Sequence, residues 1–248
     1  MNLYYSKKGL YNEVAKIKEE LGMWRNAYNF NIIDYCINDG THVEIVPFKT
    51  PGLRGMAAIG NKEQGDIILL NSHRNKTEQN FDCAHEVVHL YLHRYIGQNT
   101  FNCFDTVRHT QNPYLEWHAN EGAAEMFVPY KIFLPLVKEK IGNSTDYHII
   151  EKARYELASI FNVPETVIRL RLENLKYEIQ QYMNGVPLEE VEILSLKKQQ
   201  LKGLKIDSIN TLADNDFNEQ FSAWVASRHQ VYSTEEYIPF YDTNEFIY

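Results

Sequence analysis

Two histidines and a glutamate within one five-residue stretch are the residues of this chain best suited to metal chemistry. Residues 85–89 read His-Glu-Val-Val-His. Residues four apart on a helix share one face, so the imidazoles of His85 and His89 can reach one zinc ion. Glu86, next to the first imidazole, can direct its carboxylate at a water molecule beside that ion. The spacing predicts metal-assisted hydrolysis with Glu86 as the general base.

The neighbouring residues favour a buried catalytic helix over a surface helix with two unrelated histidines. A surface helix is polar on most of its circumference. The positions around these histidines are apolar instead, and no proline interrupts them. They are Ala84, Val87, Val88, Leu90 and Leu92. The motif defines only three positions, so these apolar neighbours strengthen the prediction of a metal site.

A catalytic zinc ion takes three protein ligands and leaves one position open, so a third ligand must come from another element. His93 is excluded, because it lies eight residues beyond His85, about 12 Å along a helix axis. Glu116, 27 residues past His89, is the best candidate. Asn120 lies four residues later on the same face, where it can hydrogen-bond a ligating imidazole. The other candidates for the third ligand are His118, Glu121 and Glu125.

One helix and several short strands are expected before the motif. The spacing of Val14, Ile17 and Leu21 predicts a helix over residues 10–22. Apolar runs bounded by turn residues predict strands. These runs cover residues 31–37, 42–48, 55–60 and 66–71. One of these strands is expected to form the sheet edge that pairs with an extended substrate beside the metal.

The motif helix is expected to be capped by Thr77 or Asn80 and to run to about Tyr95. Residues 98–113 lack periodicity and are interpreted as a loop, placed where it can gate access to the site. From Pro113 a second long helix is predicted, because proline is well placed in a first helical turn.

The rest of the chain is predicted to be helical, and the small residues 122–124 of the second long helix allow a close approach to another helix. Further helices are expected over residues 130–140, 146–161 and 164–183, with helical charge spacing over 188–204. We predict a metallopeptidase core over 1–145, a helix-turn-helix-like part over 146–185 packed on it, and a C-terminal extension of open role over 186–248.

The motif and the predicted second helix together resemble the ImmA/IrrE group of metallo-endopeptidases. Residues 116–129 read Glu-Trp-His-Ala-Asn-Glu-Gly-Ala-Ala-Glu-Met-Phe-Val-Pro. The family block typically reads Glu-x-x-Ala-Asn-x-x-Ala-Ala-Glu, followed by a leucine-rich segment and Pro. Residues 157–172 are also similar to that family, and the resemblance covers roughly residues 10–183. His118 departs from it, since many members carry a carboxylate at that position.

The resemblance implies an α+β, zincin-like fold with a small N-terminal mixed sheet, a His-Glu-x-x-His helix and a C-terminal helical part. It implies His85, His89 and Glu116 as zinc ligands and Glu86 as the base. Family members often cut a transcriptional repressor of a mobile element or stress regulon, so a repressor is the expected protein substrate. Zinc is favoured by two imidazoles and a carboxylate, although manganese or iron can bind the same donors. The candidates for stabilising the oxyanion are His118, Tyr114 and His109.

Charge and composition limit the partners. The formal net charge of −8 opposes a broad phosphate-binding face, so nucleic acid is not an expected partner. No apolar run approaches the roughly 20 residues of a membrane helix. Three cysteines and an N-terminus without a signal-peptide core favour the cytoplasm. The alternative is a non-catalytic or DNA-binding regulator that keeps the peptidase fold, with Arg169 and Arg171 on a recognition helix. No pattern specifies an oligomeric state.

Overall fold

The computed structural model describes residues 4–61 and 64–232, which form ten α-helices, one short 3-10 helix and four strands. The strands are β1 (His42–Val46), β2 (Leu53–Ala58), β3 (Ile67–Asn71) and β4 (Thr100–Phe104). The first helices are α1 (Lys7–Glu20), α2 (Ile32–Asn38), α3 (Lys76–Leu92), α4 (Pro113–Phe127) and α5 (Tyr130–Lys140). They are followed by α6 (Tyr147–Phe161), α7 (Glu165–Asn174), α8 (Lys176–Met183), η1 (Leu188–Glu190), α9 (Leu196–Leu201) and α10 (Ile209–Tyr232). The α+β fold with a small N-terminal mixed sheet is confirmed.

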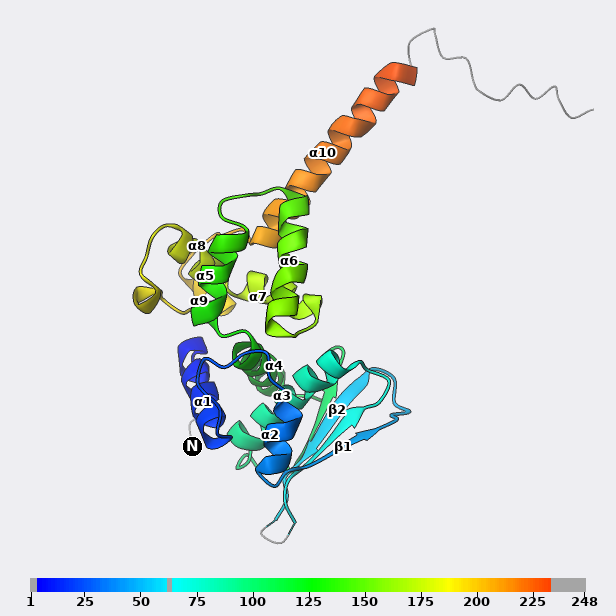
Figure 1. The fold of residues 1–248 in the computed structure, drawn as a ribbon, viewed down its shortest axis with the longest axis vertical. Coiled ribbons are helices and arrows are strands. Elements are labelled where there is room, and N and C mark those ends of the chain that lie inside the picture. The colour runs from blue at the N-terminus through cyan, green and yellow to red at the C-terminus, as the bar shows by residue number, and fades with distance from the viewer. Residues whose placement is uncertain (1–3, 62–63, 233–248) are drawn as a thin grey trace, which may run out of the picture.

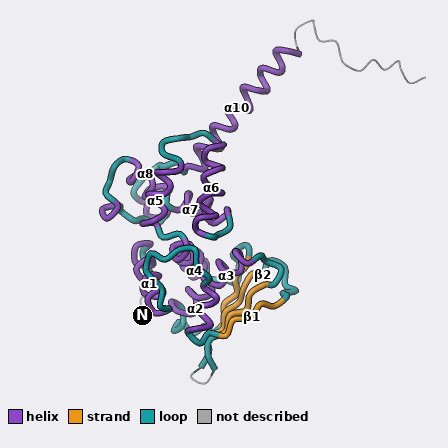
Figure 2. The backbone as a smooth tube through the Cα atoms, viewed as in Figure 1, coloured by secondary structure: helices purple, strands orange, loops and turns teal. Residues whose placement is uncertain are grey.

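The four strands form one mixed sheet in the order β1-β3-β2-β4 (Figures 1 and 2). β1 is parallel to β3, whereas β2 is antiparallel to both of its neighbours. Alternate residues of β2 are buried, and α3 packs against β2, β3 and β4. The sheet therefore leaves β1 and β4 as edges and supports the motif helix from one side.

The predicted strand over residues 31–37 is wrong, because this segment forms α2. Ile32 and Cys36 are both buried, and their spacing of four matches one helical turn. The Asn80 side chain fixes the start of α2: its Oδ1 accepts a hydrogen bond from the Ile32 N–H at 2.7 Å, and its Nδ2 donates to the Phe30 carbonyl at 2.7 Å. A contact between distant residues thus selects the helix.

Both ends of the motif helix differ from the prediction. Asn75, rather than Thr77 or Asn80, caps α3, because its side chain accepts the Glu78 N–H while the Glu78 carboxylate accepts the Asn75 N–H. The helix ends at Leu92 instead of Tyr95. The motif itself lies in the C-terminal half of α3, with His89 in the last turn of the helix.

The predicted loop over 98–113 is wrong in part, because residues 100–104 form β4. Phe101 and Cys103 are buried while their neighbours are not, which is the alternation of a strand. β4 pairs with β2 through Phe101 opposite Ala57 and Cys103 opposite Gly55. The segment between the two predicted halves of the site is therefore an edge strand followed by a connection.

The C-terminal half is helical, as expected, but the helix predicted over 164–183 is two helices, α7 and α8, which meet at Leu175. Figure 1 shows α5 to α9 gathered together and α10 extending away from them. The three-part division of the chain stays a prediction, and residues 233–248 of the proposed extension lie outside the described residues. Among the residues the structure describes, no helix combines the length and apolarity needed to cross a membrane.

Candidate metal centre

Close packing of α4 on α3 brings the two halves of the predicted site together. A Cβ on Gly122 of α4 would lie 3.0 Å from a methyl carbon of Val88, closer than side chains normally approach. Glycine at this position therefore lets the two helix backbones come near each other. Pro113 begins α4, as predicted, and Glu116 lies in its first turn.

Three ligand atoms from these helices converge. His85 Nε2 lies 3.2 Å from His89 Nε2 and 3.4 Å from a Glu116 carboxylate oxygen, and His89 Nε2 lies 3.8 Å from the other oxygen. Donors at about 2.0–2.2 Å from a tetrahedral zinc ion stand roughly 3.3–3.6 Å apart. The three residues are buried and could hold one metal ion. This donor set matches two imidazoles and one carboxylate with a position left for water.

The second nitrogen of each imidazole also has a partner. Asn120 Oδ1 lies 3.1 Å from His85 Nδ1, the contact expected from its position one turn beyond Glu116. His89 Nδ1 lies 2.9 Å from His93 Nδ1. The Phe101 ring of β4 stacks on His89 with 4.4 Å between ring centroids. The rings are therefore oriented by hydrogen bonds and, for His89, by an aromatic contact.

Charges at the site suit a cation. Burial lowers the pKa of His89 to about 4 and also lowers the pKa of His85. Burial alone would raise the pKa of Glu116, but its interactions with His85 and His89 outweigh burial and lower it to about 2. At neutral pH the group therefore consists of neutral imidazoles and one carboxylate, the protonation states that bind a metal.

Glu86 is buried with both carboxylate oxygens lacking a hydrogen-bond partner. Burial, followed by the charges of Glu116 and Asp82, raises the pKa of Glu86 well above its usual value. Its carboxylate lies against the β2 backbone, since a Cβ on Gly55 would come 2.9 Å from Glu86 Oε1. A buried carboxyl without a partner is costly, so the arrangement calls for a cation or water beside it.

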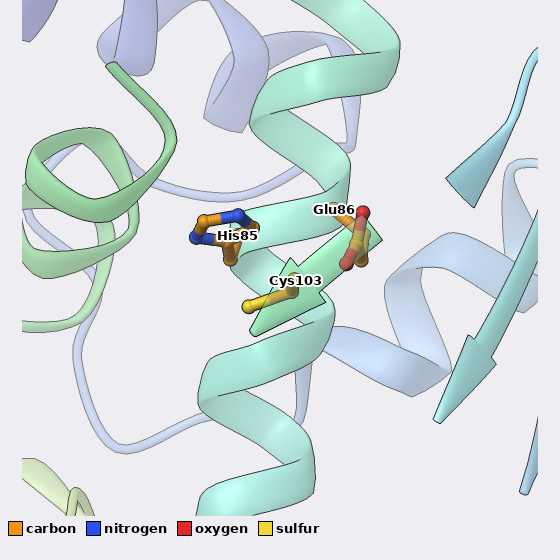
Figure 3. A group of neighbouring side chains, drawn as sticks. All are labelled: His85, Glu86 and Cys103. Carbon is orange, nitrogen blue, oxygen red and sulfur yellow. The ribbon is translucent and has the colours of Figure 1, made fainter. Parts of the chain in front are cut away.

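A second group of potential ligands overlaps the first. His85 and Glu86 of α3 lie next to Cys103 of β4, as Figure 3 shows, with their donor atoms close enough to hold one ion. Burial raises the pKa of the Cys103 thiol well above its usual value, and its sulfur accepts a hydrogen bond from Arg54 at 2.8 Å. Metals bind thiolates rather than thiols, so the group of His85, His89 and Glu116 is the better metal site.

The three candidates for oxyanion stabilisation lie in different surroundings. His118 is buried behind His93, and its Nδ1 lies 3.1 Å from His93 Nε2. The Tyr114 hydroxyl donates to the Tyr5 carbonyl at 3.0 Å. His109 is exposed in the connection between β4 and α4. The structure thus brings together His85, Glu86, His89, Glu116 and Asn120, and the assignment of the oxyanion donor stays a prediction.

Sequence reasoning missed three residues of the site: Gly55, Phe101 and Cys103. Their common signal is weak, because a glycine in a short strand and two alternating apolar residues occur in many sheets. Alternation of Phe101 and Cys103 with polar residues is nevertheless visible in the sequence and could have identified β4.

Comparison with known proteins gives the family. The family model described as the IrrE N-terminal-like domain, Peptidase_M78, matches residues 40–173, which is more than half of the chain. The match spans the sheet, both helices of the metal centre and the helices up to α7. No curated protein matches the chain. The resemblance to the ImmA/IrrE group and the zincin-like fold are thereby confirmed, and the chain belongs to the Peptidase_M78 family of metallopeptidases.

Proposed function

We propose that this protein is a zinc-dependent endopeptidase that hydrolyses a peptide bond in an extended segment of a protein substrate. One observation carries the proposal: a buried carboxyl group without an ion pair or side-chain hydrogen bond, Glu86, lies beside three buried ligand atoms spaced for a single ion. Membership of a metallopeptidase family supports the same chemistry.

His85 and His89 would hold the ion through their Nε2 atoms, and Glu116 through its carboxylate. When bound, the ion polarises the scissile carbonyl and activates water, which is the chemistry that side chains alone supply poorly. Neutral imidazoles and a carboxylate favour zinc, and manganese and iron are the alternatives for this donor set.

Glu86 moves the proton in this mechanism. The carboxylate takes a proton from the attacking water and delivers it to the leaving amine. Burial raises the pKa of Glu86, and a bound cation would lower that pKa so that the carboxylate can take the proton from water. Gly55 leaves the space that the carboxylate occupies against β2.

The edge strand β4 is the element best placed to hold the substrate. It flanks the metal centre through Phe101, which stacks on His89, and through Cys103, whose sulfur lies near His85 and Glu86. Its other edge is open for pairing, because β4 is last in the sheet order. An extended peptide added there gains backbone hydrogen bonds with little demand on its sequence.

Two glutamine side chains donate hydrogen bonds to backbone carbonyls at the open edge of β4. Hydrogen bonds to β2 alternate along β4, and the Ile59 N–H donates to Asn99, so the carbonyls of Thr100 and Asn102 point outward. Gln98 Nε2 donates to the Thr100 carbonyl at 2.7 Å, and Gln111 Nε2 donates to the Asn102 carbonyl at 2.7 Å. A substrate strand would replace these two side-chain amides with its own N–H groups.

The DNA-binding alternative is less well supported. Arg171 of α7 is fully buried in ion pairs with Glu121 and Glu125, so it is not presented to a phosphate backbone. Arg169 is exposed, but a single arginine makes a poor recognition surface. A non-catalytic role leaves the burial of an unpartnered Glu86 without a purpose.

A transcriptional repressor of a mobile element or stress regulon is the substrate we propose, on the basis of the family resemblance. The proposal places the reaction in the cytoplasm, where such repressors act. The free thiols of Cys36, Cys83 and Cys103 are compatible with a reducing compartment.

The test is cleavage of a candidate repressor, chosen from the reading frames that neighbour the gene, using zinc-loaded protein and its Glu86→Gln variant. We expect the wild type to cut the repressor and Glu86→Gln to bind stoichiometric zinc while losing at least about 100-fold in cleavage rate, since general-base catalysis is worth roughly 10²–10⁴-fold. Elemental analysis reports the metal, and mass spectrometry of the products reports the cleavage.

Glu44→Gln is the matched control, because Glu44 is an exposed glutamate on β1, at the opposite edge of the same sheet. It should cleave like the wild type. Undiminished cleavage by Glu86→Gln would refute the assigned base, and a wild-type protein that binds no metal would refute the proposed function as a whole.

A further inference from the structure

A row of four histidines runs through the interior of the protein. His85 and His89 face each other through Nε2, His89 Nδ1 lies 2.9 Å from His93 Nδ1, and His93 Nε2 lies 3.1 Å from His118 Nδ1. Each of the four residues is 0% exposed. His85 and His89 lie one turn apart on α3, His93 caps the C-terminus of that helix, and His118 comes from α4. Only the first two are needed as ligands.

A metal on His89 Nε2 determines the direction of every hydrogen bond in this row. A neutral imidazole that binds metal through Nε2 carries its proton on Nδ1. That N–H of His89 must donate to His93 Nδ1, which is therefore unprotonated. His93 then carries its proton on Nε2 and donates it to His118 Nδ1. The tautomers of three residues thus follow from one metal bond.

We propose that His93 is a positioning residue for the metal ligand His89, and that His118 holds His93 in the tautomer that this task requires. This inference rests on the proposed metal-dependent function. A ligating histidine usually donates its second N–H to a carboxylate, a carbonyl or water, which orients the ring and increases its basicity. Here a neutral imidazole takes the place of that acceptor.

Both ring nitrogens of His93 are engaged, one with His89 and one with His118, so neither is free to bind the ion. The opposite polarity, with His93 donating to His89, would require an unprotonated Nδ1 on His89. A neutral His89 would then carry its proton on Nε2, which excludes metal binding there.

The surroundings of His118, at the end of the row far from the ligands, indicate that the row orients imidazole rings and does not transport protons. His118 Nε2 is buried and has no hydrogen-bond partner. The ring of His118 is enclosed by aromatic side chains, with its centroid 4.2 Å from that of Tyr114, 5.3 Å from that of Tyr5 and 5.4 Å from that of Trp117. A proton that reached this end would find no acceptor among the described residues, so the row holds rings in place.

The experiment compares His93→Leu, His93→Asn and His118→Leu in the full chain. Zinc affinity is measured by competition with a chelator, and the site geometry is followed by the visible absorption of the cobalt-loaded protein. Loss of an outer hydrogen-bond partner typically weakens metal binding by about 10–100-fold. We expect this loss and an altered cobalt spectrum for His93→Leu, and a smaller loss for His118→Leu.

His93→Asn is the conservative variant, because its Oδ1 branches from Cγ as Nδ1 does in histidine and can accept the same hydrogen bond. It should recover most of the affinity and the wild-type cobalt spectrum. Thermal unfolding of the metal-free variants separates this effect from a loss of folding. Nitrogen-15 NMR of the zinc-loaded wild type needs no variant and should show His93 protonated at Nε2.

Two results overturn the positioning role alone: zinc binding by His93→Leu as tight as that of the wild type with the same cobalt spectrum, or NMR that places the His93 proton on Nδ1. A wild-type protein that binds no zinc or cobalt overturns the proposed function and this inference together. The two failures are therefore distinguishable by the behaviour of the wild type.

Discussion

The two faces of α4 bury acidic side chains in opposite ways. On one face, Glu116 and Asn120 approach the histidines of α3. On the other face, Glu121 and Glu125 meet Arg171 of α7 in what we call the Arg171 ion-pair cluster. Both pairs have a spacing of four residues, so the members of each pair lie on the same side of the helix.

The Arg171 ion-pair cluster is complete in itself. Glu121 accepts hydrogen bonds from Arg171 at 2.7 Å, Tyr11 at 2.5 Å and Asn174 at 3.0 Å. Arg171 also pairs with Glu125 and donates to the Val128 carbonyl. Arg171 is shared by the two carboxylates, and each carboxylate accepts at least one further hydrogen bond, as a buried ion pair requires. Burial nevertheless raises the pKa of Glu125 to about 7.

The carboxyl groups at the other face of α4, which carries Glu116 and Asn120 and which we call the metal face, lack cationic partners. Glu116 has only neutral imidazoles for partners, and the nearby Glu86 has neither a hydrogen bond nor an ion pair among the described residues. Glu116, Glu121 and Glu125 are all buried, so burial of the carboxyl groups does not distinguish the two faces. Buried carboxyl groups that lack a cationic partner indicate the face that binds a ligand. Buried carboxyl groups that are paired with an arginine indicate the face that holds helices together.

The largest effect is expected from breaking the complete face with Arg171→Met. Removing one partner of a buried ion pair typically costs about 3–5 kcal/mol, and chemical denaturation should show a loss of this size. The orphaned carboxyls would have pKa values above those in the unfolded chain, so their protonation preserves stability at low pH and the loss grows as pH rises. Arg169→Met, at an exposed position of the same helix, should change little. Unchanged stability of Arg171→Met would refute the comparison.

Removing the Glu116 carboxylate should weaken zinc binding, whereas removing the Glu121 carboxylate should lower stability. Glu116→Ala is expected to lose zinc, with affinity falling by more than the roughly 100-fold limit for outer hydrogen-bond partners. Glu121→Ala, on the opposite face, should destabilise the fold but retain stoichiometric zinc. Elemental analysis measures the zinc content of both variants, and thermal unfolding measures their stability. Stoichiometric zinc in Glu116→Ala would move the third ligand elsewhere.

A smaller loss is expected for Asn120→Ala, which removes the hydrogen-bond acceptor of His85 Nδ1. Zinc affinity should fall by about 10–100-fold, measured by chelator competition. Asn120→Asp keeps an acceptor oxygen at the same place and should recover most of this loss. Equal affinities for the wild type and Asn120→Ala would show that the contact does not orient the ligand.

The smallest expected effect is the dependence of zinc affinity on pH. At pH values below its raised pKa, Glu86 of the metal-free protein carries a proton, whereas a bound cation favours the ionised form. Zinc affinity should therefore increase with pH, by at most about tenfold per unit for one proton, until pH exceeds the raised pKa. Calorimetry in buffers of different ionisation enthalpy should show that Glu86→Gln releases one proton fewer than the wild type when it binds zinc. Equal proton release by both proteins would contradict this titration.

Several features of the site could be predicted from the sequence because they depend on positions within one helix. The four-residue spacing of His85 and His89 places both imidazoles on one side of α3 whatever surrounds it. The same spacing links Glu116 and Asn120, and Pro113 supplies a start for α4. Helical periodicity therefore predicted which side chains share a face, His85 with His89 and Glu116 with Asn120.

Only the tertiary structure decided the features that depend on contacts between distant residues. A short apolar run suits a strand or a short helix, and the Asn80 side chain selects the helix for residues 32–38. Pairing with β2 makes β4 a strand and brings Cys103 to the metal centre. His93 and His118 meet because α3 and α4 pack closely. Local spacing specifies a face of a helix, but what lies opposite that face follows from packing alone.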